Sequence, residues 1–137
     1  MDTSKNVHAQ ERFGDQVVNG GDIAAIDEIV APDFLDHDPA PDQGPGADGF
    51  KDFWTSFRTS FPDLSVTVDS MVAEDDKVAI AYRAKGTHQG DFMGVAATGK
   101  PIDVRGVQIT RFSEGLMVER WGSSDQFGIL AQVGVAG

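Results

Sequence analysis

The sequence predicts an α+β fold in which N-terminal helices pack on a curved antiparallel or mixed sheet. Segments with helical periodicity come first, up to about residue 61, and segments with strand-like alternation follow as far as residue 123. Helices that precede a run of strands favour a layer of helices on one face of the sheet. A sheet that curves around a long helix forms a cone open at one end, so we expect it to enclose a ligand pocket.

Three helices are predicted before the strands. The first spans about residues 5–19 and ends at Gly20-Gly21, because glycine tolerates the left-handed conformation that follows a helix. Asp22 is placed to cap a short apolar helix that stops near Pro32. After a loop rich in Pro and Gly, the third helix carries aromatic residues at helical spacing, which form one face: Phe50, Phe53, Trp54, Phe57 and Phe61.

Alternating apolar and polar residues predict the strands. A brief strand or turn lies at residues 34–38, and longer strands cover residues 64–69, 77–88, 101–112 and 116–123. Ser113-Glu114-Gly115 is typical of a hairpin turn, so the last two strands are expected to be antiparallel. A short helix near residues 127–130 is expected to close a single domain over residues 1–137.

Composition excludes several classes of function. The chain has no cysteine, which removes disulfides, thiolate zinc sites and cysteine nucleophiles together. A net charge of −11 without a basic run argues against nucleic acid and against anionic membranes. No apolar stretch approaches the ~18 residues of a membrane span, and the polar segment Met1–Gln10 does not resemble a signal peptide. The expected location is the cytoplasm.

Four motifs, in this order, resemble the SnoaL-like polyketide cyclases of the nuclear-transport-factor-2-like superfamily. They are Phe61-Pro62-Asp63-Leu64, Gly86-Thr87-His88-Gln89-Gly90, Gly94 with Thr98-Gly99-Lys100, and Trp121 with Asp125. The resemblance covers nearly the whole chain. It implies a cone-shaped α+β barrel that closes a ring by aldol condensation of a polyketide ester, with no metal and no cofactor. The ligand implied is a small hydrophobic carbonyl compound.

The resemblance implies that one buried carboxylate, with a pKa raised towards neutrality, acts as both general acid and general base. Asp125 matches the aspartate that has this role in the family. Asp125 also directly precedes the closing helix, so the alternative is that it serves as the N-cap of that helix.

Histidines supply the other candidate polar groups. His88 ends a strand and is a candidate to hydrogen-bond a substrate carbonyl as negative charge develops on it; a purely structural hydrogen bond is the alternative. His37, between Asp36 and Asp38, is a weaker candidate for substrate binding. Adjacent residues of an extended segment point to opposite faces, so these three residues are a poor metal site.

Larger side chains are candidates to line the pocket. Trp54 and Phe57 can stack against a planar ligand, although aromatic residues at helical spacing more often form core. Trp121 shares strand parity with Ser123, so it is expected to line the cavity if no bulge intervenes. Gln108 alternates with apolar neighbours and is expected to point inward as an orienting amide.

Two further functions stay open. One is a hydrolase or isomerase on the same scaffold, acting by epoxide opening or by ketosteroid-isomerase-like migration of a double bond. Epoxide opening usually needs an Asp–Arg–Asp cluster, which the sequence alone does not reveal. The other is a non-catalytic domain for hydrophobic ligands or for dimerisation. A buried Asp125 facing the pocket would favour catalysis, and a solvated cap would favour the binding domain.

The last strands predict a homodimer. Ile102 and Val104 oppose Val107 and Ile109, so the sheet is apolar on both faces. One face can cover the interior of the cone, and the other is expected to meet a second copy of the chain.

Overall fold

A computed structural model describes residues 3–134 and contains one five-stranded mixed sheet, in the order β1-β5-β4-β3-β2. β1 pairs with β5 in parallel, and the other pairs are antiparallel. The strands are β1 Val30–Asp36, β2 Ser65–Glu74, β3 Lys77–Thr87, β4 Pro101–Ser113 and β5 Leu116–Ser124. The predicted α+β class is confirmed.

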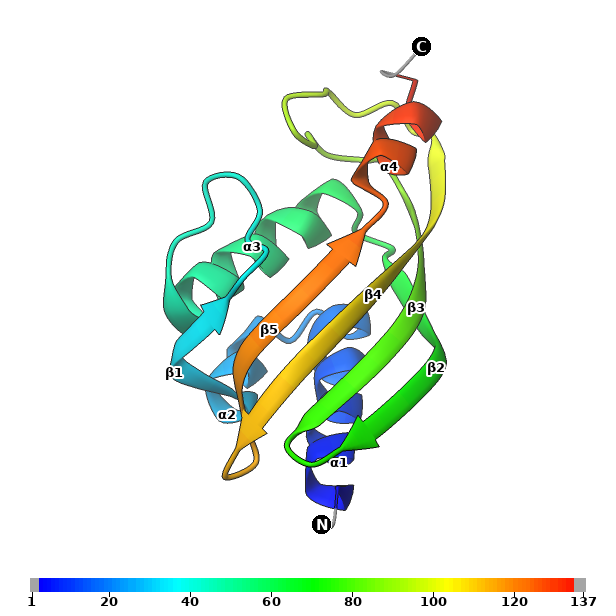
Figure 1. The fold of residues 1–137 in the computed structure, drawn as a ribbon. Helices are drawn as coiled ribbons and strands as arrows, with labels where there is room; N and C mark the ends of the chain where they lie inside the picture. The colour runs from blue at the N-terminus through cyan, green and yellow to red at the C-terminus, as the bar shows by residue number, and fades with distance from the viewer. Residues whose placement is uncertain (1–2, 135–137) are drawn as a thin grey trace.

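Helices cover one face of this sheet, as Figure 1 shows for α1 and α3. Within residues 3–134, no helix is long and apolar enough to cross a membrane. The helical segments are α1 Ser4–Arg12, the π-helical η1 Phe13–Asn19, the 3₁₀ turn η2 Ile23–Ala25, α2 Ile26–Ile29, α3 Gly46–Ser60 and α4 Gln126–Gln132.

Two details of the predicted second helix are wrong. The Asp22 side chain makes no capping hydrogen bond; its backbone carbonyl accepts one from Ala25 N–H at 3.2 Å, because the segment opens as a 3₁₀ turn. The helix ends at Ile29, and Pro32 lies inside β1 rather than stopping a helix. Proline is tolerated there because β1 is an edge strand.

Aromatic residues of α3 form the centre of the core. Phe50 is buried and stacks on Phe13 of η1, with the ring centroids 5.6 Å apart. Phe61 directly follows the helix and is also buried. Phe57 lies edge-on to Phe61 at 5.2 Å, so the aromatic face predicted from the sequence is continuous in space.

The two faces of the sheet differ along β4. Its even-numbered residues from Ile102 to Thr110 are buried beneath the helices, and its odd-numbered residues over the same stretch are exposed. A register shift between Arg111 and Phe112 changes the pairing with β5. Phe112 pairs with Met117, whereas Arg111 pairs with Glu119, so one residue of β5 is left over as a bulge. Beyond the bulge, the even-numbered residues of β5 share a face with the even-numbered residues of β4.

Candidate functional site

A cavity of about 630 Å³ lies between the helices and the inner face of the sheet. A smaller cavity of about 300 Å³ adjoins it and shares Trp54, Arg120 and Ser124 with it. Most of the larger cavity is apolar. Among the apolar residues that line it are Phe13, Phe53, Phe57, Met71 and Ile80. A volume of this size suits a ligand of several rings.

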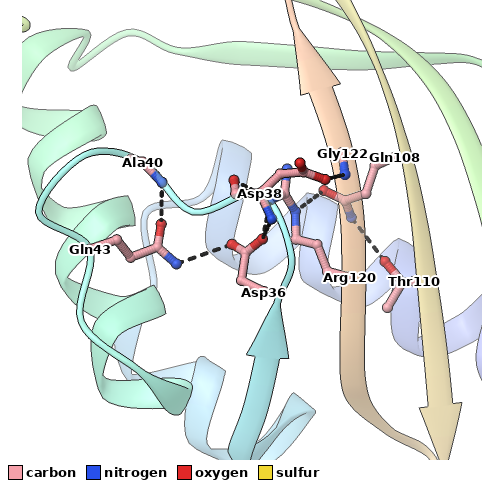
Figure 2. Close-up of polar contacts among 8 residues, drawn as sticks. All are labelled: Asp36, Asp38, Ala40, Gln43, Gln108, Thr110, Arg120 and Gly122. Carbon is pink, nitrogen blue, oxygen red and sulfur yellow. Dashed lines mark hydrogen bonds and ion pairs between the residues drawn. The ribbon is translucent and has the colours of Figure 1, made fainter.

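A buried ion pair borders the two cavities: Arg120 lines both of them, and Asp36 lines the smaller one. Parallel pairing of β1 with β5 places Asp36 beside Arg120, and Arg120 Nη1 donates to Asp36 Oδ1 at 2.7 Å. The Asp36 side chain is 6% exposed and the Arg120 side chain is 15% exposed. Figure 2 shows the pair at the end of β1. The carboxylate and further hydrogen bonds compensate the desolvation of this buried guanidinium.

The loop that follows β1 completes the surroundings of Asp36. Gln43 donates to Asp36 Oδ2 at 3.1 Å, and the backbone N–H of Asp38 donates to Asp36 Oδ1 at 2.9 Å. Asp38 itself lines the smaller cavity, and its Oδ2 accepts from Gly122 N–H at 2.8 Å. Asp36 therefore accepts hydrogen bonds from three donors, whereas Asp38 is exposed and lies beside the smaller cavity.

Arg120 is fixed from the sheet side as well (Figure 2). Its Nε donates to Gln108 Oε1 at 2.8 Å, and Gln108 Nε2 donates to Thr110 Oγ1 at 3.0 Å. Gly122 leaves room for the guanidinium, since a Cβ on this glycine would come within 2.3 Å of Arg120 Nη2. A preorganised cation at an apolar cavity is suited to stabilise an oxyanion.

Tyr82 adds a second donor to the cavity. Burial raises the pKa of its phenol, and the nearby Arg120 charge and a hydrogen bond with Ser124 oppose that rise without cancelling it. The phenol is thus protonated at neutral pH. Gly106 makes room for it, because a Cβ at that position would lie 2.3 Å from the Tyr82 hydroxyl oxygen.

Three of the residues predicted to bind substrate line the larger cavity. Trp54 and Phe57 reach it from α3, and Gln108 reaches it from β4 with only 9% of the residue exposed. Four further residues of the cavities were not predicted from the sequence: Asp36, Asp38, Tyr82 and Arg120. The alternation of Asp36, His37 and Asp38 along an extended segment was the available signal, since it sends the two carboxylates to one face and the imidazole to the other.

Trp121 and His37 lie on the other face of the sheet. Their rings are stacked, with centroids 4.8 Å apart and planes 8° apart, and His37 Nε2 lies 2.5 Å from Glu119 Oε2. The prediction that Trp121 lines the cavity required an unbroken hairpin. Without a bulge Trp121 would pair with Gln108, but in the structure it pairs with the outward-facing Ile109.

His88 is buried away from both cavities. Its Nδ1 lies 2.9 Å from Thr98 Oγ1, its backbone N–H donates to Lys100 O at 2.9 Å, and its carbonyl accepts from Gly99 N–H at 2.8 Å. These bonds join the end of β3 to the end of the following loop. This geometry agrees with the alternative in which His88 makes purely structural hydrogen bonds.

Asp125 caps α4. Its Oδ1 accepts from Gly128 N–H at 2.7 Å, and the residue is exposed. Ser124 and Gln126 on either side line the cavities, but Asp125 does not. In the structure Asp125 therefore serves as the N-cap of α4, and its catalytic role stays a prediction. Across residues 3–134, no group of three or more His, Cys, Asp or Glu side chains could hold a metal ion.

Comparison with known proteins identifies the family. A model of the SnoaL-like polyketide cyclases matches residues 8–133. The chain belongs to this family. No curated protein matches it. Several solved structures match it over nearly its whole length. TsrD from Streptomyces laurentii is 26% identical over 98% of both chains, with a TM-score of 0.89. IdmH from Streptomyces antibioticus, named as a candidate polyketide cyclase, is 33% identical over 94% of this chain and 98% of its own, with a TM-score of 0.80.

A third matching structure carries a different functional name. AclR from Streptomyces galilaeus, named as a candidate hydroxylase, is 27% identical over 97% of this chain and 98% of its own, with a TM-score of 0.84. The fold is thus shared by proteins with different assigned activities, so the reaction must be argued from the residues of the cavity.

Proposed function

We propose that this SnoaL-like protein catalyses the intramolecular aldol cyclisation of a polyketide ester without a cofactor. The observation that carries the proposal is the buried guanidinium of Arg120, which pairs with Asp36 and lines a large apolar cavity. Such a cavity holds a folded carbonyl chain, and the guanidinium stabilises the negative charge that develops during ring closure. The family match and the name of IdmH support the same class of reaction.

Different residues carry out proton transfer and stabilise the negative charge. A carbon flanked by two carbonyl groups loses a proton to Asp38, and the enolate oxygen accepts hydrogen bonds from Arg120 and Tyr82. The enolate carbon then attacks a second carbonyl and forms the new carbon–carbon bond. The resulting alkoxide takes the proton back from the carboxyl group. Asp36 holds Arg120 in place, and the overall step is an isomerisation with no co-reactant.

Other predicted residues keep proposed roles around this step. Trp54 and Phe57 offer aromatic surface to the folded chain, and Gln108 orients Arg120. Asp125 is the alternative proton acceptor, because the residues on either side of it line the cavities. His88 is proposed to fix the loop at the end of β3 rather than to contact the substrate.

A cyclisation assay tests the proposal. Purified wild-type protein and an Arg120→Met variant are incubated with a panel of β-keto polyketide esters and followed by chromatography with mass detection. Ring closure keeps the mass and changes the retention time. We expect wild-type protein to convert at least one ester and the variant to convert none. Saturable binding of the esters by wild-type protein without conversion would contradict the proposal and favour a ligand-binding domain.

Epoxide opening is a second candidate, favoured by one observation. The structure brings Asp36, Arg120 and Asp38 together, which is the residue set that the sequence did not reveal. A water molecule activated by a carboxylate would attack an epoxide carbon, and the epoxide oxygen would be protonated to give a diol. An aryl-substituted epoxide in ¹⁸O-labelled water distinguishes the two activities, because a diol gains the mass of one labelled water and an aldol product does not.

We also propose that the outer face of the sheet forms a homodimer. Val72, Ile109 and Trp121 lie in one register row across β2, β4 and β5, and Val107 beside them is 54% exposed. An isologous contact places this apolar row against its own copy. Light scattering at micromolar concentration should give the mass of two chains for the wild type and of one chain for Val107→Glu. A wild-type monomer would contradict the proposal.

A further inference from the structure

Gln10 is a polar residue in an apolar position of α1. Its neighbours on the same face are Val7 and Phe13, three residues away on either side, and Val17 follows one turn later. All three pack in or against the core. Gln10 is only 5% exposed, so a leucine or methionine would be the ordinary choice for this position.

The amide of Gln10 is not satisfied by the protein. Its Oε1 is buried and accepts no hydrogen bond within the part of the chain that the structure describes. Two other buried side-chain atoms in the described part of the chain also lack a hydrogen-bond partner, Trp54 Nε1 and His88 Nε2. Gln10 and Trp54 line the larger cavity, whereas His88 does not. Buried polar atoms are normally hydrogen-bonded, and an unpaired acceptor destabilises the fold relative to an apolar residue of similar size.

We infer that Gln10 determines ligand specificity, with its Oε1 accepting a hydrogen bond from a hydroxyl group of the bound ligand. Gln10 lies on the helical side of the cavity, and Arg120 lies on the sheet side. The ligand is therefore a hydrophobic compound with a carbonyl group at Arg120 and a hydroxyl group at the helical wall. This inference rests on the carbonyl site of the proposed function but not on the reaction that follows binding.

Three naphthyl ketones test this assignment. 2-Acetylnaphthalene carries only the carbonyl, 6-acetyl-2-naphthol adds a hydroxyl at the far end, and the methyl ether of that naphthol keeps the oxygen but removes the donor. Their dissociation constants are measured by calorimetry with wild-type protein and with Gln10→Met. The matched control is Gln89→Met, which changes an exposed glutamine outside both cavities.

We expect wild-type protein to bind the naphthol about tenfold more tightly than the parent ketone, since a desolvated hydrogen bond to a ligand hydroxyl has an effect of this order. The methyl ether should bind no better than the parent. Gln10→Met should reduce the tenfold preference to less than about twofold while leaving the parent ketone bound at least as tightly. Gln89→Met should keep the preference. The ligand-free Gln10→Met variant should unfold at the same temperature as wild type or higher.

Three results would overturn the inference. If Gln10→Met lowers the unfolding temperature and leaves the preference unchanged, the residue is structural. If the methyl ether binds as tightly as the naphthol, Oε1 does not accept from the ligand. Failure of all three ketones to bind wild-type protein would contradict the carbonyl site of the proposed function as well, so the two failures are distinguishable.

Discussion

The two faces of the sheet carry similar polar networks at the same place in the chain. On the inner face, Asp36 pairs with Arg120, with side chains 6% and 15% exposed. On the outer face, His37 contacts Glu119, which also pairs with Arg111, and these side chains are between 18% and 37% exposed. The inner network borders the two cavities described above, and the residues of the outer network line neither of them. The face to which a strand residue points therefore decides whether it borders one of these cavities.

The same comparison separates two kinds of electrostatic effect. An exposed ion pair is screened by water and stabilises a protein by about 1 kcal/mol or less. A buried pair gives little net stability when complete, but the loss of one partner leaves an unpaired charge in a poorly solvated site. Removing one partner from each network should therefore lower the stability of the protein by very different amounts.

Removal of the inner guanidinium should have the largest effect. Arg120→Met leaves the buried Asp36 carboxylate unpaired, so we expect the free energy of unfolding to fall by about 3–5 kcal/mol and turnover to be lost. Arg111→Met on the outer face should cost no more than about 1 kcal/mol and keep turnover. Urea unfolding and the cyclisation assay measure both. Equal losses for the two variants would show that burial does not distinguish the networks.

Tyr82 should have the next largest effect. Tyr82→Phe removes one donor to the developing oxyanion and should reduce kcat by about 10²-fold. Tyr82 is the only tyrosine in the chain, so absorbance at alkaline pH reports its ionisation directly. The midpoint should lie above the ordinary value of 10.0, because burial raises the pKa of the phenol. Arg120→Met should raise it further, as the nearby charge lowers it. A wild-type midpoint at or below 10.0 would contradict the described environment.

Gly122 tests the space around the guanidinium. In Gly122→Ala, the new Cβ would meet Arg120 Nη2 at 2.3 Å, so the guanidinium must leave its bonds to Asp36 and Gln108. We expect turnover to fall by about tenfold and stability by about 1–3 kcal/mol, the usual range for overpacking. Ser123→Ala changes an exposed neighbour that lines the smaller cavity, but it adds no atom near the guanidinium, so it should change stability by less than about 0.5 kcal/mol. Full activity of Gly122→Ala would show that the position of the guanidinium is not critical.

The outer network should show the smallest effect, limited to low pH. Hydrogen bonds from His37 and Arg111 hold the pKa of Glu119 below its ordinary 4.5. A lowered folded-state pKa contributes stability above pH 4.5, and that contribution disappears as the pH falls through the lowered value. Calorimetry between pH 3 and pH 7 should show a shallower decline in unfolding temperature below pH 4.5 for Glu119→Gln than for wild type. Its turnover at neutral pH should match wild type.

Periodicity was sufficient to predict most of the fold. The aromatic spacing located α3, and alternation with a hairpin turn located β4 and β5, because these signals are local. Asp22 was misassigned because a capping residue type does not determine whether its side chain or its backbone carbonyl accepts. Pro32 was misassigned because the sequence does not reveal that the strand it occupies is at the edge of the sheet.

The site was predicted only in part, and the bulge in β5 explains the main error. One extra residue near Val118 reverses the parity of the strand, so that Trp121 points outward and Arg120 points into the cavity. The cavity positions of three residues were predicted correctly because no such irregularity lies between them and their neighbours: Trp54, Phe57 and Gln108. The Asp36–Arg120 pair joins residues that are distant in the chain, and no local pattern predicts a parallel pairing at an edge.

The central claim is that the proton acceptor lies in the inner network, at Asp38, and that Asp125 acts as a helix cap. The cyclisation rates of Asp38→Asn and Asp125→Asn test it most directly, since both changes remove a base and keep the side-chain shape. Asparagine can still accept from Gly122 N–H at position 38, and it caps a helix as well as aspartate does at position 125. We predict that Asp38→Asn lowers turnover by about 10²–10⁴-fold and that Asp125→Asn leaves it within a few-fold of wild type. Loss of turnover in Asp125→Asn, with Asp38→Asn active, would contradict the account.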